Sequence, residues 1–405
     1  MLVQHRRSRK HVAPQAQRPS YTPPCAHYPN CFGCNFIDLP YPLQLTRKHR
    51  LVTDALALHP VLAALKVPPV VPSPRRLRYR TRVKLVVRQA RQRVLTGLYV
   101  PETHRVVDIS SCPVHPEAVN RVLQFLKRRL PALGILPYDE RNDQGQVRYL
   151  DFRYSLWRKE ILLTLVTRHR SFPQGQSLAR ALTKRFPFIA GVLHNVNEQK
   201  GNAIWGNDFR VLAGRDSLME RVGFLKLIYP AEAFSQTNPA VATKIYEAIF
   251  EWAALNSRDA VLDLYCGVGP ISLYLAASAR VVWGVDQSAV AIATAKQNAR
   301  LNGFGNCRFF AGDAAKEIPD AKLKLQQIDL VVLNPPRKGM RPDVLESLLS
   351  CETPRIIYVS CNPVTLARDL SRLAQGGYET RAIQAFDMFP QTAEVETIAL
   401  LQKTT

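Results

Sequence analysis

The chain lacks an apolar run long enough to cross a bilayer, although 46% of its 405 residues are hydrophobic. No apolar stretch follows the charges of its basic N-terminus, so residues 1–20 do not read as a secretory signal. They also lack periodic apolar positions and are predicted to be a disordered basic tail. No internal repeat is evident. These absences predict a cytoplasmic protein with no membrane partner.

Acidic residues are scarce in the first part of the chain. Residues 1–230 hold 38 Lys and Arg against 14 Asp and Glu, a net +24, whereas residues 231–405 hold 17 against 18, a net −1. A basic part joined to a neutral part indicates that one part holds a polyanion while the other does the chemistry. The alternative is a solvated basic surface, but we interpret the asymmetry as binding of nucleic acid.

Three of the eight cysteines are bunched near the N-terminus, as Cys25-x5-Cys31-x2-Cys34. In a cytosolic chain this spacing favours a metal site over disulfides. Zinc and iron both accept thiolate ligands, and the spacing alone does not choose between them.

The composition divides the chain into four segments. Residues 21–75 carry the cysteine group, a helix-like stretch at 43–65 and a proline-rich break. Residues 76–230 are predicted to form a central basic α+β domain that binds RNA. Residues 231–405 alternate helices with strands, which predicts a doubly wound, Rossmann-like parallel sheet. The expected helices are 239–255, 271–277 and 288–301, and the expected strands are 260–265, 280–286, 307–310, 329–333, 355–360 and 398–401.

A strand-like stretch at 78–87 places basic side chains at alternate positions. Period two puts Arg78, Arg80, Arg82 and Lys84 on one face. Such charges can protect an edge strand from aggregation, but within a basic segment we expect this face to contact RNA. Tyr79 either stacks on a base or packs inside the protein.

A glycine turn, Asp263-Leu264-Tyr265-Cys266-Gly267-Val268-Gly269, separates an expected strand from a helix. Glycines let a ligand approach the backbone at this position in Rossmann-like sheets. The third glycine of a dinucleotide fingerprint is absent, and Asp286 ends the next strand, where a carboxylate can accept ribose hydroxyls. The pattern favours S-adenosylmethionine over NAD and assigns Asp263, Gly267 and Gly269 to its site. The alternative is a purely structural turn.

Two further motifs follow expected strands at the carboxyl edge of the sheet, where ligands bind. The first is Asn334-Pro335-Pro336-Arg337, which resembles motifs of amine methyltransferases but has Arg337 where those place an aromatic residue. The second is Ser360-Cys361-Asn362-Pro363, whose cysteine is a candidate nucleophile. Near the C-terminus, Glu394 or Glu396 could be a general base, and spacing alone does not choose between them.

Taken together, these residues resemble the uracil-C5 RNA methyltransferase family, and the resemblance covers nearly the whole chain after residue 20. The matching motifs are the cysteine group, Phe234-Ser235-Gln236-Thr237-Asn238-Pro239, the glycine turn, the Asn334–Arg337 and Ser360–Pro363 motifs, and Asp387-Met388-Phe389-Pro390-x-Thr392-Ala393-x-x-Glu396.

The resemblance implies a role for each matching position. Cys361 would be the nucleophile and Glu396 the base that removes the C5 proton. S-adenosylmethionine would contact Gln236, Tyr265, Asp286 and Asn334. A [4Fe-4S] cluster would be held by Cys25, Cys31, Cys34 and Cys112.

Two departures narrow the expected substrate. Many members carry a small β-barrel before the cysteine group, for which Cys25 comes too early, and many have Asp where Asn334 stands. Both features resemble the branch that methylates 23S ribosomal RNA. We therefore expect a monomer, without an obligate protein partner, that acts on a uridine in a single-stranded loop of 23S rRNA. The alternatives are another rRNA site, a tRNA, or an RNA-binding or assembly protein with a vestigial transferase site.

Overall fold

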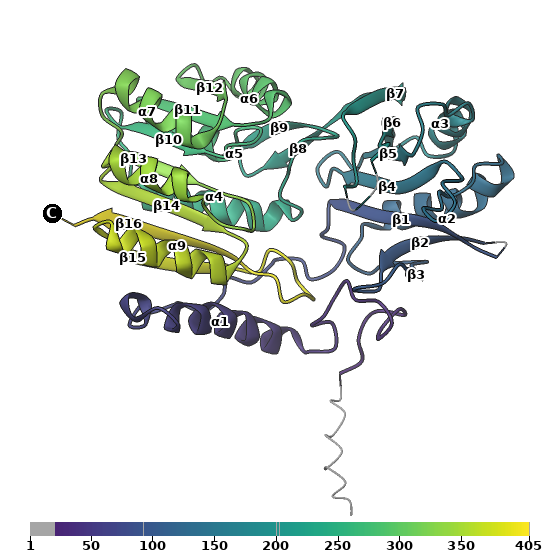
Figure 1. Cartoon of the computed structure of the whole chain (residues 1–405), viewed down its shortest axis with the longest axis horizontal. Coiled ribbons are helices and arrows are strands. Elements are labelled where there is room, and N and C mark those ends of the chain that lie inside the picture. Colours follow the sequence, from purple (N-terminus) through teal and green to yellow (C-terminus); the bar gives the residue numbers. More distant parts are fainter. Residues whose placement is uncertain (1–20, 92, 200, 202, 405) are drawn as a thin grey trace, which may run out of the picture.

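Two seven-stranded sheets lie side by side in the computed structural model, which describes residues 21–91, 93–199, 201 and 203–404 (Figure 1). The predicted tail, residues 1–20, lies outside the described residues. Among the described helices none combines the length and the apolar character needed to span a bilayer.

The first sheet has the strand order β3-β2-β1-β4-β5-β6-β7 and is antiparallel except for the β5–β6 pair. Helices α2 and α3 cover one of its faces, where Val83, Leu85 and Val87 of β1 join the core. Arg82 and Lys84 lie on the opposite face, so the predicted period of two is confirmed for these two residues. The strand was predicted to begin at residue 78, but β1 begins at Arg82. Arg78 and Arg80 precede it, and the φ of 54° at Arg78 is incompatible with a strand. The elements are β1 (Arg82–Ala90), β2 (Arg93–Tyr99), β3 (Val106–Asp108), α2 (Glu117–Ala132), β4 (Val147–Tyr154), β5 (Ile161–Thr167), α3 (Gly175–Arg185), β6 (Ile189–Val196) and β7 (Asp208–Gly214).

The second sheet has the order β12-β11-β10-β13-β14-β16-β15 and confirms the predicted doubly wound fold. Its first five strands are parallel, whereas β16 runs antiparallel between β14 and β15. The elements are α4 (Pro239–Ala253), β10 (Ala260–Leu264), α5 (Pro270–Ala276), β11 (Val281–Asp286), α6 (Ala289–Leu301), β12 (Cys307–Ala311), α7 (Ala314–Leu325), β13 (Leu330–Leu333), α8 (Pro342–Cys351), β14 (Arg355–Ser360), α9 (Pro363–Gln375), β15 (Tyr378–Phe386) and β16 (Glu396–Lys403).

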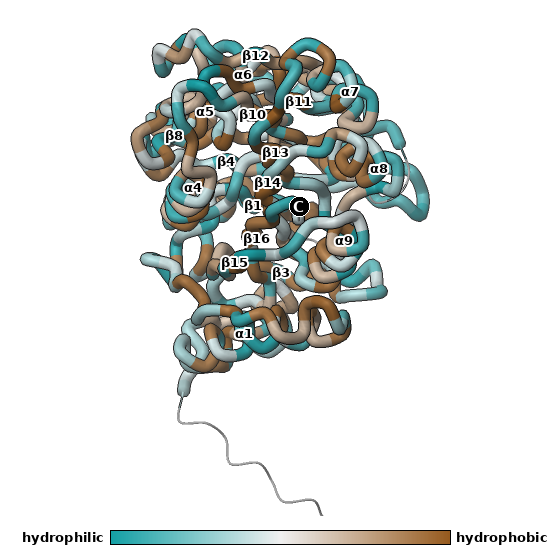
Figure 2. The backbone as a smooth tube through the Cα atoms, turned by 90° about the vertical axis from the view of Figure 1, so that its left-hand side faces the viewer, coloured by the Kyte–Doolittle hydropathy of each residue, from teal (hydrophilic) through white to brown (hydrophobic). Residues whose placement is uncertain are grey.

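Helices cover both faces of this sheet, and the apolar strands run between them (Figure 2). One core contains side chains of α4, α5 and α6, and the other contains side chains of α7, α8 and α9. The hairpin β8 (Ser217–Val222) and β9 (Leu225–Pro230) adds Val222, Leu225 and Leu227 to the first of these cores. Both faces are therefore apolar, as the near-continuous hydrophobic strands require.

An N-terminal helix, α1 (Tyr41–Ala57), packs beside α9 on the second sheet (Figure 1). The sequence predicted a helix to residue 65, but the regular helix ends at Ala57 and only a short 3₁₀ turn, Pro60–Leu62, follows. His59 is extended, with φ −118° and ψ 108°, because the ring of Pro60 disfavours a helical residue before it.

Candidate active site

The glycine turn forms the connection between β10 and α5, at the carboxyl edge of the second sheet. Three of its residues have positive φ: Tyr265 at 62°, Gly267 at 56° and Gly269 at 87°. A side chain on Gly267 would meet no heavy atom within 4 Å, so open space lies beside this backbone. A left-handed tyrosine costs about 1 kcal/mol or more, and such strain concentrates at functional sites. The turn thus presents backbone and the half-buried Tyr265 to a vacant volume.

Two carboxylates fix the turn from opposite sides. Asp286 accepts the backbone N–H of Gly267 at 2.9 Å and that of Ser288 at 2.8 Å, and it stays partly exposed. Asp263 is fully buried, and its Oδ2 accepts the hydroxyl of Ser272 at 2.5 Å. Burial raises the pKa of Asp263 to about 7. Asp286 therefore holds the turn from a partly exposed position, whereas Asp263 supports it from the buried side.

Two more predicted residues come from neighbouring segments. Asn334 directly follows β13, and its backbone N–H donates to Leu264 O at 3.3 Å. Gln236 lies in residues 231–236, the segment that joins β9 to α4 and that we call the strap. Gln236 and Ser235 of the strap line a pocket together with Arg153. The glycine turn, Asp286 and Asn334 therefore lie at the same edge of the second sheet, whereas Gln236 belongs to the strap.

Cys361 and Glu396 stand at matching positions on adjacent strands. The antiparallel register pairs Ser360 of β14 with Thr397 of β16. Cys361, one residue after Ser360, is thereby brought opposite Glu396, one residue before Thr397. The charge of Glu396 raises the pKa of the Cys361 thiol, after the larger effect of burial. The structure thus brings together two groups that are 35 positions apart in the sequence.

The two candidate bases differ sharply in environment. Glu396 is 2% exposed, and burial raises its pKa to about 8, against the opposing effect of Arg337. Glu394 is exposed, and its Oε2 accepts Arg337 Nη2 at 2.5 Å. Arg337, Cys361 and Glu394 line the same open cavity. Burial therefore distinguishes the two candidate bases, which the sequence spacing did not. Glu396 is shielded from water and protonated near neutral pH, whereas Glu394 is paired with an arginine.

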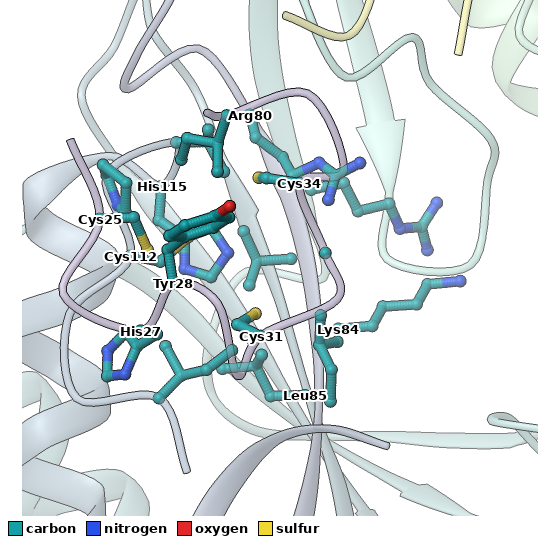
Figure 3. A pocket seen from close by; sticks show the side chains of 18 residues that line it. Cys25, His27, Tyr28, Cys31, Cys34, Arg80, Lys84, Leu85, Cys112 and His115 are labelled. Carbon is teal, nitrogen blue, oxygen red and sulfur yellow. The ribbon is translucent and has the colours of Figure 1, made fainter. Parts of the chain in front are cut away.

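Cys25, Cys31, Cys34 and Cys112 surround a single cavity of about 60 Å³ between the N-terminal segment and the first sheet (Figure 3). Burial and mutual repulsion raise the pKa values of three of these thiols: Cys31, Cys34, to about 12, and Cys112, to about 11. In the part of the chain that the structure describes, no three His, Cys, Asp or Glu side chains stand close enough to hold one metal ion.

The structure decides between the two alternatives for Tyr79 and shows that the expectation for Arg82 is wrong. Tyr79 is fully buried, and its hydroxyl donates to Pro390 O at 2.9 Å, so it packs rather than stacks on a base. The Arg82 side chain is 8% exposed and donates to Ala233 O at 2.7 Å and Ala231 O at 2.9 Å. Its donors are used inside the protein because the strap crosses the face that was expected to contact RNA.

Sequence patterns do not mark the buried polar side chains that support these sites. Arg153 is 5% exposed and donates to Ser235 Oγ at 2.6 Å and to the carbonyls of Ala231 and Ala233. Lys48 forms a buried ion pair with Asp387. His115 lines the cysteine cavity. None is marked by a local pattern, because each is defined by contacts with distant segments.

Comparison with known proteins identifies the family. A family model described as tRNA (uracil-5-)-methyltransferase matches residues 40–404, which is most of the chain. The chain belongs to this family. Its relatives include an uncharacterized RNA methyltransferase of Geobacter sulfurreducens, 39% identical over 94% of this chain and 77% of the relative. Another, from Halalkalibacterium halodurans, is 36% identical over 94% of this chain and 83% of the relative.

A solved structure shares the arrangement of this RNA methyltransferase. The tRNA (uracil-54, C5)-methyltransferase of Pyrococcus abyssi, in complex with S-adenosyl-L-homocysteine, superposes with a TM-score of 0.74 at 28% identity. The match covers 92% of this chain and 86% of the Pyrococcus chain. It supports the class I methyltransferase fold that the sequence predicted.

Proposed function

We propose that this methyltransferase uses S-adenosylmethionine to methylate C5 of a uridine in RNA. The observation that carries the proposal is the pair Cys361 and Glu396, held opposite each other on β14 and β16 at the edge that also carries the glycine turn. A uracil ring between them would meet a nucleophile on one side and a base on the other. An amine methyltransferase needs neither group.

The reaction follows from these two groups. The Cys361 thiolate forms a bond to C6, and the electron pair of the C5–C6 double bond moves toward C5 and O4. When bound, S-adenosylmethionine would supply the methyl group: its methyl–sulfur bond would break as C5 bonds to the methyl carbon, and S-adenosyl-L-homocysteine would leave. Glu396 then accepts the proton from C5, and the C6–sulfur bond breaks to restore the double bond and the thiolate. The high pKa of Glu396 makes it an effective proton acceptor once it is ionised.

We assign the cofactor to the open space beside the glycine turn. Its contacts would be the backbone at Gly267 and Gly269, the ring of Tyr265, the carboxylate of Asp286 and the amide of Asn334. Gln236 would reach it from the strap, and Asp263 would act through Ser272 and the turn. The vacant volume beside Gly267 and the partly exposed position of Asp286 support this assignment.

An RNA that contains 5-fluorouridine tests the covalent step, because fluorine at C5 cannot leave as a proton and the adduct persists. The wild-type protein should form an adduct stable to denaturing electrophoresis, and Cys361→Ala should form none. The matched control is Cys351→Ala, which removes a thiol buried in the core that contains side chains of α7, α8 and α9. This variant should form the adduct normally. Methylation by Cys361→Ala would reject the mechanism and favour amine methylation.

Glu396→Gln separates the two halves of the reaction. The glutamine cannot take the C5 proton, so ordinary RNA should accumulate as a methylated covalent complex with Cys361. Mass spectrometry of the complex would show the added methyl group. Normal turnover by this variant would exclude Glu396 as the base. Failure of the wild-type protein to bind S-adenosylmethionine in calorimetry would instead indicate a vestigial site.

We further propose that Cys25, Cys31, Cys34 and Cys112 hold a [4Fe-4S] cluster. The four thiols of a tetrahedral zinc site lie about 4 Å apart, since each bond is about 2.3 Å long. The four thiols of a cluster bind four different irons and surround a larger core. A cavity of about 60 Å³ ringed by thiols that are not gathered for one ion fits the cluster better. Anaerobic purification with iron, sulfide and zinc analysis tests this, and one zinc without sulfide would overturn it.

The proposed substrate is a uridine in a single-stranded loop of 23S rRNA, with tRNA as the competing substrate. Asn334 in place of Asp supports the ribosomal assignment, whereas the resemblance to the Pyrococcus enzyme supports tRNA. Mass mapping of 5-methyluridine in both RNAs decides between them. A deletion strain should lose one 5-methyluridine in 23S rRNA, and the wild-type gene but not Cys361→Ala should restore it. Loss from tRNA alone would reassign the substrate.

A further inference from the structure

One buried polar atom at the cysteine cavity has no hydrogen-bond partner among the residues that the structure describes. His115 is 5% exposed, and its Nδ1 is buried without a hydrogen bond. The residue lines the cavity, and Figure 3 shows its imidazole among the cysteine side chains. Buried polar groups are nearly always hydrogen-bonded, so an orphaned one at a ligand cavity indicates that the ligand supplies the partner.

A second group with the same property lines the cavity. Arg80 Nε is buried, and within the described ranges no group forms a hydrogen bond with it. Its backbone N–H donates to Val114 O at 3.1 Å, which fixes the arginine against the turn from Cys112 to His115. Its guanidinium lies 5.9 Å from the centre of the Phe389 ring. A neutral donor and a permanent cation therefore face the same four cysteines.

The other histidine of the cavity does not share this property. His27 Nε2 accepts the backbone N–H of Ser110 at 3.2 Å, and the side chain sits in an exposed contact. His27 therefore joins the cysteine loop to the segment before Cys112. His27 Nε2 is thus used within the protein, whereas His115 Nδ1 and Arg80 Nε have no hydrogen-bond partner in the part of the chain that the structure describes.

A sulfur-rich metal centre is the partner that such donors fit. Four thiolates around an iron–sulfur core carry net negative charge, and reduction adds one more. Hydrogen bonds to the sulfurs and nearby positive charge stabilise the more negative state, so they raise the reduction potential. Neither group needs to bind iron, since the four cysteines already supply a full ligand set.

We propose that His115, through Nδ1–H, donates a hydrogen bond to a sulfur of the cluster and that Arg80 supplies the adjacent positive charge, so that together they set its reduction potential. This inference rests on the proposed cluster. His115 and Arg80 are positioning groups for the metal centre and take no part in methyl transfer.

Matched substitutions separate the donor from the bulk of the side chain. His115→Asn keeps an N–H near the position of Nδ1, whereas His115→Leu fills a similar volume without a donor. The potential is measured on anaerobically purified full-length protein by electron paramagnetic resonance during redox titration. His115→Leu should favour the oxidised state by about tenfold, a shift of about 59 mV to lower potential for one electron, and His115→Asn should restore most of it. Arg80→Gln should shift it in the same direction.

Resonance Raman spectroscopy of the oxidised cluster adds a readout that does not require reduction. Loss of a hydrogen bond to sulfur strengthens the iron–thiolate bond, so its stretching frequency should rise in His115→Leu and not in His115→Asn. Unchanged potential and frequency in His115→Leu, with a full iron and sulfide content, would overturn the inference but leave the cluster standing. Loss of one iron from that variant would make His115 a ligand and overturn it as well. Absence of iron and sulfide from the wild-type protein would overturn the cluster and this inference together.

Discussion

A carboxyl group that is 2% exposed must become charged before it can take a proton, and burial opposes that charge. In Glu396 burial wins over Arg337 and raises the pKa to about 8. The rate at which the methylated covalent complex with Cys361 breaks down to free product in a single turnover should therefore rise about tenfold per pH unit from pH 6 and level off above pH 8. Rapid-quench measurements with RNA check this, and a flat profile between pH 6 and 9 would contradict it.

The same carboxyl links pH to stability. Its pKa is near 4.5 in the unfolded chain and about 8 in the folded one, so between these values the native state binds the extra proton. Stability conferred by that proton is present below pH 4.5 and is lost as pH rises through 8. Glu396→Gln should thus be more stable than wild type at pH 9, by on the order of 3 kcal/mol, and similar at pH 5.

Urea unfolding at the two pH values measures this difference. Glu394→Gln is the matched control, because Glu394 is exposed and paired with Arg337. It should show no gain in stability at pH 9. Equal stability of Glu396→Gln and wild type at both pH values would mean that Glu396 is not desolvated as the structure has it.

At the scale of elements, the strap leads from the β8–β9 hairpin to α4 and carries Gln236. Two arginines of the first sheet hold it: Arg82 and Arg153 donate to the carbonyls of Ala231 and Ala233. Asp151 is 4% exposed and pairs with Arg82, which offsets part of the buried charge. The strap is therefore held by arginine side chains that each donate to two carbonyls, which the single ammonium group of a lysine cannot do in the same way.

Arg82→Lys should loosen the strap while it keeps the charge. The lysine can replace one of the two carbonyl contacts, so we expect binding of S-adenosylmethionine to weaken by about tenfold through Gln236. Calorimetry measures the affinity, and circular dichroism checks that the fold persists. The matched control is Arg93→Lys, an exposed arginine at the start of β2, which should bind normally. Unchanged affinity in Arg82→Lys would show that the strap does not position Gln236.

The strap also shows where sequence reasoning succeeds and where it stops. The alternation of Arg82 and Lys84 on one face follows from the local period of a strand, and the placement of Asp286 and Cys361 follows from strand ends that meet at one edge. Which segment covers a face of the sheet, however, depends on contacts between residues that are far apart in the sequence. A segment about 150 residues away covers Arg82, and the antiparallel entry of β16, which brings Glu396 to Cys361, is likewise set by packing.

At the scale of the whole molecule, one loop contacts three parts: the cysteine segment, the residues that lead into the first sheet, and helix α1. Residues 387–394 contact the cysteine segment, where Asn35 Oδ1 accepts Ala393 N–H at 2.7 Å, and the residues that lead into the first sheet, through Tyr79. Helix α1 reaches the loop through the ion pair of Lys48 with Asp387, both fully buried. Glu396, the proposed base, comes two residues after this loop, so contacts with all three parts help to position it.

Removal of one member of that ion pair should destabilise the protein strongly. Lys48→Met leaves Asp387 buried without its cation, at a cost of about 3–5 kcal/mol. The double variant Lys48→Met with Asp387→Asn removes the uncompensated charge and should recover part of the loss. Urea unfolding of the four members of the cycle measures the coupling. If the losses of unfolding free energy in the two single variants add up to the loss in the double variant, the two groups do not interact.

The charge asymmetry of the molecule predicts how RNA approaches the site. Many basic side chains of the first part are exposed, and Arg75, Arg76 and Arg78 lie in a segment whose backbone meets both sites. Gln391 Nε2 donates to Arg76 O at 3.4 Å, and Arg78 N–H donates to Pro113 O at 2.9 Å. These arginines therefore stand between the loop that precedes Glu396 and the turn that carries Cys112. An RNA strand that enters the Cys361 cavity from the cysteine side would pass over them.

Substitution of Arg75, Arg76 and Arg78 by glutamine should weaken RNA binding and flatten its salt dependence. Each lost phosphate contact reduces the slope of log affinity against log salt by about 0.7 for a single strand, so three contacts reduce it by about 2. Binding of S-adenosylmethionine should not change. The matched control replaces Arg91 and Arg93, exposed at the far end of β1 and the start of β2, and should leave the slope intact. If the slope of log affinity against log salt is the same in the two variants, the RNA must bind another surface. Counterion release reports only the phosphates that the protein neutralises.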